Sequence, residues 1–291
     1  MTTPHLGKAL VLGLAALGLA GGAYHAAVAA PVATDQVVLV PHRAVYDLKL
    51  AKTSGSRGIE AVRGRILYDF SGNACDGYDL KFRQLSELDS GEGKTVLSDL
   101  NSTTWEDAKA KAFRFSSQTR TNDKAGDPVN GEAERRAKAV AISLSKPKHK
   151  ALKMPPDAVF PTEHMRRIIA AARSGQNMLE LPVYDGSETG EKLYNTFTLI
   201  GKAILPGAKP PADAAANVPA LEKLTRWPVT ISYFDKLADS ERRKGEQTPV
   251  YVIGFELYEN GISRKLVLDY NDFTIEGDMT SLEMKKEKPC K

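Results

Sequence analysis

The sequence lacks the residue patterns that most enzymes use. Only five histidines occur in 291 residues, and three of them, His42, His149 and His164, follow the N-terminal leader described below. None stands in a metal-binding spacing such as H-E-x-x-H, and there is no G-x-S-x-G elbow, P-loop or dinucleotide-binding glycine pattern. We therefore predict no catalytic residue, no cofactor and no metal. We expect His164, beside Arg166 and Arg167, to have a solvated or hydrogen-bonded surface role.

Cysteine is nearly absent, with only Cys75 and Cys290. A redox pair usually has a close spacing such as C-x-x-C, which these two do not have. In an exported protein an even number of cysteines favours pairing, so we expect a structural disulfide between an early turn and the C-terminal tail. The chain-entropy model predicts a stabilisation on the order of 5 kcal/mol for so long a loop.

Long apolar runs are also missing, except for residues 9–22 near the N-terminus. That run is shorter than the ~20 residues that span a bilayer, and no basic cluster follows it, which disfavours a membrane anchor. Lys8 precedes it, and Ala27 and Ala29 follow at the spacing that a signal peptidase reads. We predict that 1–29 is a cleaved signal peptide and that 30–291 is a single exported domain.

No strong excess of either charge is present. Forty basic residues face 36 acidic ones, for a net charge of +4. This balance is too mild to imply nucleic acid, but it permits weak attraction to an anionic membrane surface.

What the sequence does have is a two-residue alternation of apolar and polar side chains. In residues 44–50, Ala44, Tyr46, Leu48 and Leu50 share one face, as in a half-buried strand. Further strands are predicted over 63–70, 78–88, 112–116, 251–257 and 264–270. Asn260-Gly261 is a strong signal for a tight hairpin, and such short links make neighbouring strands antiparallel. The fold class is mainly β, with roughly a dozen strands.

One segment has a helical period. Pro161 and Glu163 suit a first turn, Met165, Ile168, Ile169 and Ala172 form an apolar stripe, and Gly175 ends the helix. Arg166, Arg167 and Arg173 are expected to face water. We predict that this amphipathic helix plugs or covers one side of a curved sheet.

Two stretches are predicted to be loops. Residues 145–156 carry five basic side chains and three prolines, which is typical of a solvated loop, although contact with anionic lipid is an alternative. Residues 205–219, rich in Pro and Ala, are expected to form a long mobile excursion.

The best group of carboxylates is in the segment 184–190, where Asp185 and Glu188 lie three residues apart between Gly186 and Gly190. Such turns can bind Ca²⁺, but an EF-hand needs more carboxylates. We prefer a polar turn in which Asp185 bonds its own backbone. The strand aromatics, among them Phe113, Tyr233 and Tyr251, are explained by core packing or by an acyl-chain groove, and the sequence leaves both open.

Several short motifs, taken in order, resemble the EipB-like cell-envelope integrity family. The resemblance covers nearly all of the chain after the leader, and one departure is Tyr184, where the family pattern suggests Phe. The motifs that carry it are Val40-Pro41-His42-Arg43-Ala44-Val45-Tyr46, Phe160-Pro161-Thr162-Glu163-His164-Met165, Pro182-Val183-Tyr184-Asp185-Gly186-Ser187-Glu188, Trp227-Pro228-Val229 with Ile231-Ser232-Tyr233-Phe234, and Cys290.

The resemblance implies a periplasmic β-spiral, or broken barrel, of antiparallel strands around a helix. It also implies a disulfide, which would join Cys75 and Cys290, and a non-catalytic role in envelope integrity. Our leading hypothesis is a monomer that binds an envelope protein or lipidic partner on its curved sheet. A periplasmic carrier of apolar ligand or lipoprotein is the second hypothesis, and an envelope hydrolase using Asp185 and Glu188 is the third.

Overall fold

The computed structural model describes residues 37–54, 58–91, 93–209, 211–235 and 248–290. These residues belong to one compact unit within Pro31–Lys291. They form a single antiparallel sheet of fifteen strands that does not close, together with one main helix. This confirms the predicted mainly-β spiral, with three strands more than the dozen expected. The predicted signal peptide lies outside the described residues.

The strands follow one another along the chain, with helices after the ninth and eleventh. The bounds are β1 His42–Thr53, β2 Ala61–Asn73, β3 Gly77–Asp89, β4 Thr95–Glu106, β5 Ala112–Thr121, β6 Lys124–Ala125, β7 Val129–Arg136, β8 Ala139–Lys146, β9 Lys150–Met154, α1 Pro161–Arg173, β10 Met178–Val183, β11 Tyr194–Ile200, η2 Ala214–Ala216, α2 Pro219–Glu222, β12 Arg226–Asp235, β13 Tyr251–Tyr258, β14 Ser263–Asp269 and β15 Phe273–Met284.

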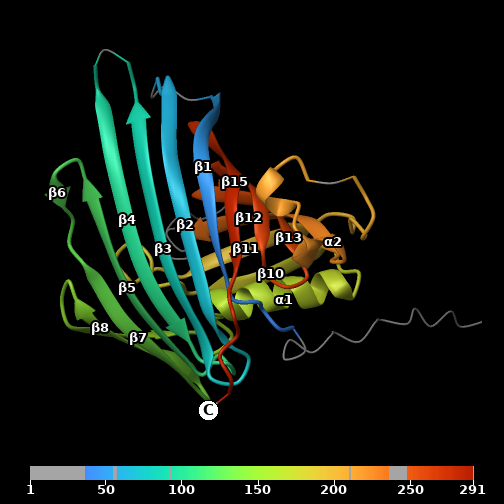
Figure 1. Ribbon diagram of the computed structural model, residues 1–291. Coiled ribbons are helices and arrows are strands. Elements are labelled where there is room, and N and C mark those ends of the chain that lie inside the picture. The colour runs from blue at the N-terminus through green and yellow to red at the C-terminus, as the bar shows by residue number, and fades with distance from the viewer. Residues whose placement is uncertain (1–36, 55–57, 92, 210, 236–247, 291) are drawn as a thin grey trace, which may run out of the picture. The chain divides into compact units, whose positions relative to one another are not determined.

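The order of strands in the sheet nearly repeats the order of the chain. β1 pairs with both β2 and β15, so the sheet runs outward from there to β9 at one end and β10 at the other. The helix α1 connects these two ends (Figure 1). The segment before α1 touches the end of β10 through a parallel bridge between Val159 and Val183. We call this place, where the helix rather than a strand ladder joins β9 to β10, the seam.

The alternation in the sequence sorts side chains onto the two faces of the sheet as predicted. Ala44, Tyr46 and Leu48 of β1 are buried, and Asp47 between them forms an ion pair with Arg65 of β2. The predicted hairpin at Asn260-Gly261 joins β13 to β14, and Gly261 has the positive φ (91°) that a tight turn needs.

The face of the sheet that carries α1 is called the inner face below. Ile168 and Ile169 of α1 are fully buried against side chains of β2, β3, β12 and β13, including Phe70, Val229 and Leu257. The helix ends at Arg173, and Gly175 follows with φ +77°, as the sequence indicates. The predicted plug is therefore confirmed as an interior helix.

Two predictions about this helix are wrong. Arg166 does not face water: it is 7% exposed, and its Nη1 donates to the carbonyl of Ala108 at 2.7 Å. His164 is not at the surface either, being 4% exposed with Nε2 3.5 Å from Thr196 Oγ1. The physical reason is that strands enclose the first half of α1 on several sides, so the polar positions 164 and 166 are covered, whereas Arg173 at the end of the helix is exposed, as predicted.

One predicted loop is wrong, and the other is confirmed as a loop. Most of 145–156 is the hairpin of β8 and β9, in which the strand positions Leu144 and Leu152 alternate with exposed lysines. Residues 205–209 and 211–219 lack regular structure apart from η2 and the first residue of α2, as predicted, but contacts hold the second half of this stretch against the sheet. Asp213 and Arg264 form a buried ion pair at 2.6 Å, and Ala216 is buried in the core beside β14 and β15.

The structure contains the disulfide between Cys75 and Cys290, with a Cα–Cα distance of 5.6 Å. Cys75 lies in the turn between β2 and β3, and Cys290 lies in the tail after β15. Asn73 adds a hydrogen bond from Nδ2 to the carbonyl of Lys288 at 3.2 Å. The tail is thus held at the end of the neighbouring strands β15, β1 and β2.

No helix in the described part of the chain combines the length and the apolar character that crossing a bilayer requires.

Candidate functional site: the inner face of the sheet

The helix does not cover the whole inner face. Across β2 to β5, one row of directly paired residues points inward, and each of its members is only half-buried: Tyr68, Phe82, Ser102 and Ser117. Their inward neighbours Leu80, Gln84 and Leu100 are also half-buried. We call this set of seven side chains the open wall. It combines apolar surface with hydroxyl groups, which is the character of a binding surface for an amphiphilic or apolar partner.

The carboxylates around the start of α1 are paired with N–H groups and arginines. Glu106, at the end of β4, is 1% exposed and accepts the backbone N–H groups of Thr162 and Glu163, each at 2.7 Å. It caps the helix from another element, since Phe160 at the N-cap position has no side-chain acceptor. Burial raises the pKa of Glu106 to about 7, against the two N–H donors and Arg166, which lower it.

Glu163, in the first turn of α1, is also paired. Its carboxylate accepts from Arg135 Nη2 at 2.7 Å and from Arg167 Nη2 at 2.6 Å. Arg135 also lies 5.1 Å over the ring of Phe160. This group fixes the helix to the strands near the seam, and we assign it a structural role.

The three histidines lie on different elements with different neighbours. His42 is 2% exposed, stacks on Tyr68 and has Nδ1 2.8 Å from the carbonyl of Val40. His164 lies in α1, and His149 is exposed in the turn between β8 and β9. Burial lowers the pKa of His164 to about 4, which keeps it neutral at neutral pH.

Asp185 lies in the turn between β10 and β11. As predicted, its Oδ1 accepts a local backbone bond, from the N–H of Ser187 at 2.9 Å. Tyr184 closes the turn by donating its hydroxyl to the carbonyl of Gly190 at 2.7 Å. Gly186 has φ +68°, and a side chain there would meet the ring of Phe115 at 2.5 Å. The turn is therefore seated against β5 while it presents Asp185 to the strands beyond.

Three tyrosines from successive strands gather beside this turn. Tyr194, Tyr233 and Tyr251 come from β11, β12 and β13, and their ring centroids lie 4.5 to 5.9 Å apart. Burial raises the pKa of each phenol, and the negative charge of Asp185 raises it further. We call Asp185 and these three side chains the acidic tyrosine cluster. Asp185, Tyr233 and Tyr251 are half-buried, so the cluster is accessible.

The hydrolase hypothesis uses Asp185 and Glu188 as catalytic groups, but both carboxylates form contacts that stabilise the turn. Glu188 accepts from the hydroxyl of Tyr194 at 2.7 Å and pairs with Lys192 at 2.8 Å. Asp185 uses Oδ1 for the Asx turn. In the part of the chain that the structure describes, no three His, Cys, Asp or Glu side chains are placed to hold a metal ion.

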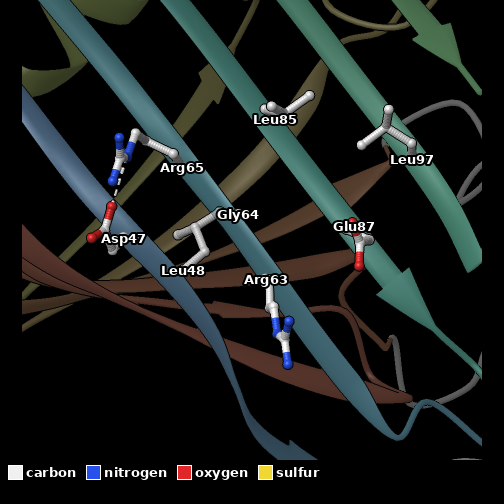
Figure 2. A pocket seen from close by; sticks show the side chains of 8 residues that line it. All are labelled: Asp47, Leu48, Arg63, Gly64, Arg65, Leu85, Glu87 and Leu97. Carbon is white, nitrogen blue, oxygen red and sulfur yellow. Dashed lines mark hydrogen bonds and ion pairs between the residues drawn. The ribbon is translucent and has the colours of Figure 1, made fainter.

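The opposite face of the sheet has a shallow hollow of about 460 Å³ over β1 to β4. Figure 2 shows its lining, in which Arg65 reaches Asp47 and Leu85 lies near Leu97. Arg63 and Glu87 are cross-strand partners there. Two charges of each sign and two exposed leucines give this hollow no preference for one kind of ligand, so we assign it no role.

The sequence indicates several residues of the inner face but does not show that they lie close together. The turn at Asp185 and the strand aromatics Tyr233 and Tyr251 were each singled out, whereas Tyr194 was not. Glu106 was also missed, because a lone Glu at the end of a polar strand carries no local signal. Only the pairing of β11 with β12 and of β12 with β13 brings the three tyrosines to one place.

Comparisons with known proteins agree with this architecture. The profile of the EipB-like family matches residues 33–286. The cell envelope integrity protein EipB of Brucella abortus (strain 2308) is 37% identical over 252 residues, covering 87% of this chain and 86% of that protein. The crystal structure of a beta-barrel-like protein of a domain of unknown function, also from Brucella abortus, superposes with a TM-score of 0.78 at 35% identity. It covers 86% of this chain and 100% of that chain. None of these names describes a catalytic activity.

Proposed function

The chain belongs to the EipB-like family, and on that premise we propose that it is a non-catalytic periplasmic protein that maintains cell-envelope integrity by binding a protein or lipidic partner on its inner face. The name of the relative from Brucella abortus supports the role in envelope integrity. The predicted signal peptide supports the periplasmic location.

The observation that carries the binding proposal is the open wall. Core side chains of a large domain are normally buried completely, as Ile168 and Leu257 are here. Phe82 and Leu100 face the same interior and keep part of their surface exposed. Apolar surface that remains exposed on a concave face, next to hydroxyl groups, is typical of a site that a partner covers.

A periplasmic carrier of apolar ligand is the second candidate, and the same surface favours it. The two candidates differ in the molecule that should co-purify with the protein. A carrier would be purified from the periplasm with lipid, whereas a scaffold would be purified with a protein.

The test compares two leucines of one strand. Leu100 belongs to the open wall, whereas Leu97 on β4 is 41% exposed on the opposite face. Each is replaced by Asn in a strain that lacks the chromosomal copy, and growth is measured with detergent and with cell-wall antibiotics. We expect Leu100→Asn to leave the strain sensitive and Leu97→Asn to restore resistance, at equal protein levels by immunoblot.

Full resistance with Leu100→Asn would overturn the role of the open wall. A deletion strain that is as resistant as its parent would overturn the role in envelope integrity itself.

A further inference from the structure

We propose that the acidic tyrosine cluster recognises an ammonium group at the end of an apolar chain, so that the partner held on the inner face is a lipid-like amine. This inference rests on the proposed function and names the chemistry of its ligand. Three features support it: the charge of Asp185, the aromatic rings around it, and the apolar surface beside them.

Within the ranges that the structure describes, no cation balances the charge at the cluster. Among the described residues, Asp185 has no ion-pair partner, and the like charge of Glu188 acts on it as well. Lys192, which follows the turn, pairs with Glu188 at 2.8 Å and with Asp235 at 3.1 Å. A half-buried carboxylate without a cation is costly, because burial disfavours the ionised form. A ligand cation would remove that cost.

The groups around Asp185 suit an organic cation. Aromatic rings attract an ammonium group electrostatically over their faces, and protein sites for ammonium ligands commonly combine several such rings. Tyr233 and Tyr251 stack at 4.5 Å, and Tyr194 stands edge-on to both at 5.9 Å. The buried Ser187 Oγ lies beside the carboxylate without a well-directed hydrogen bond, which leaves an acceptor for an N–H donor.

Apolar surface continues directly from the cluster. Ile253 follows Tyr251 on the same face of β13, pairs across the sheet with Ile231 and Leu268, and is half-buried. Leu266 of β14 is half-buried in the same core as Tyr233. A polar end next to an apolar track matches a molecule with one cationic end and an acyl or alkyl chain, better than it matches a lysine side chain of a folded protein.

The experiment uses the mature protein and three amphiphiles with the same twelve-carbon chain, each below its micelle concentration. Their head groups are an ammonium (dodecylammonium), an uncharged sugar (dodecyl maltoside) and an anion (dodecyl sulfate). Affinity is measured by isothermal titration calorimetry. We expect dodecylammonium to bind about tenfold more tightly than the maltoside, the factor that about 1.4 kcal/mol supplies.

Variants assign that preference to the cluster. Asp185→Asn keeps an oxygen for the N–H of Ser187 and removes the charge, so the tenfold preference should fall to less than about twofold while maltoside binding is retained. Asp47→Asn is the matched control, because it removes a carboxylate from the opposite face of the sheet. It should leave all three affinities unchanged. Melting curves verify that each variant is folded.

The outcomes separate this inference from the proposed function. If all three amphiphiles bind equally and Asp185→Asn changes nothing, the ammonium site is wrong and the apolar binding face stands. If none of them binds, the inference and a lipidic partner are both overturned, and a protein partner on the inner face still stands. Tighter binding of dodecyl sulfate than of dodecylammonium would overturn the inference, as would binding of a short lysine peptide at the cluster without binding of dodecylammonium.

Discussion

Glu106 and Asp185 are two acids turned toward the interior, and the protein surrounds them differently. Glu106 is 1% exposed and accepts two backbone N–H groups from the start of α1, with Arg166 nearby. Asp185 is half-buried, accepts hydrogen bonds only from within its own turn, and faces tyrosines and another carboxylate. The difference teaches that burial alone does not mark a functional acid. A fully partnered acid holds the structure, and one without a cation is available to a ligand.

The largest loss of stability is expected when the disulfide between Cys75 and Cys290 is removed. Cys75→Ser removes a disulfide that closes 215 residues of sequence, and we expect a loss of about 2–5 kcal/mol in the free energy of unfolding. Urea denaturation measures it, with reductant added to the wild type as the reference. Equal stability with and without reductant would contradict a structural staple. Amphiphile binding by the folded variant should be unchanged, since the acidic tyrosine cluster is on other strands.

Removing the carboxylate of Glu106, which caps α1 from β4, should lower the free energy of unfolding somewhat less. Glu106→Ala leaves the N–H groups of Thr162 and Glu163 without their acceptor and Arg166 without a nearby carboxylate. We expect a loss of about 3 kcal/mol by urea denaturation.

Glu106→Gln tests how ionisation of Glu106 affects stability. Because burial raises the pKa of Glu106 from 4.5 to about 7, its favourable contribution is present below pH 4.5 and is lost as the pH rises to about 7. Gln does not titrate, so the variant should lack this loss. An unchanged pH profile of stability would show that Glu106 is not the buried acid we describe.

His164 provides a test of the buried side of α1, because its contribution to stability is lost as the pH falls, whereas that of Glu106 is lost as the pH rises. Its pKa is lowered by burial from 6.5 to about 4, so the unfolded chain binds the proton first. Its contribution is present above pH 6.5 and is lost as the pH falls to about 4, by roughly 2–3 kcal/mol. His164→Gln should remove that part of the acid destabilisation in melting curves from pH 7 to 4. A surface histidine would produce no such difference.

The smallest change in stability is expected at Asp185. Burial raises its pKa, so protonation favours the folded state, and the contribution of the acid is lost as the pH rises through the folded pKa. Asp185→Asn should therefore be as stable as the wild type at pH 8, or more stable by up to about 1 kcal/mol. Its advantage should shrink toward pH 4. A large destabilisation at pH 8 would place Asp185 with Glu106 among the structural acids.

The sequence allows the strands to be predicted where one face is apolar and the other polar. β1 and β13 follow that rule. β4 and the β8–β9 hairpin do not show it clearly, because β4 carries Ser102 and Thr104 on its inner face and because prolines flank the lysines of β9. The helix was predicted from its stripe, but its burial on the polar side depends on Glu106 and Ala108, which come from a distant part of the chain.

The acidic tyrosine cluster shows the same limit. The turn chemistry of Asp185 is local and follows from Asp-Gly-Ser. The meeting of Tyr194, Tyr233 and Tyr251 depends on which strands are neighbours and in what register, and the first tyrosine lies 57 positions before the last. No short-range pattern in a single sequence contains that information.

The bond between Cys75 and Cys290 also changes what a protease can do to this protein. Every peptide bond from β3 to β15 lies within the covalent ring that the disulfide closes. One cut in that ring, for example in the turn between β8 and β9, opens the ring without releasing a fragment. The two pieces stay joined, and the remaining strand pairs can keep them folded. Under oxidising conditions a single cut within the ring therefore leaves one molecule, and two cuts are needed before any part of β3 to β15 can diffuse away, whereas β1 and β2 precede Cys75 and lack this protection.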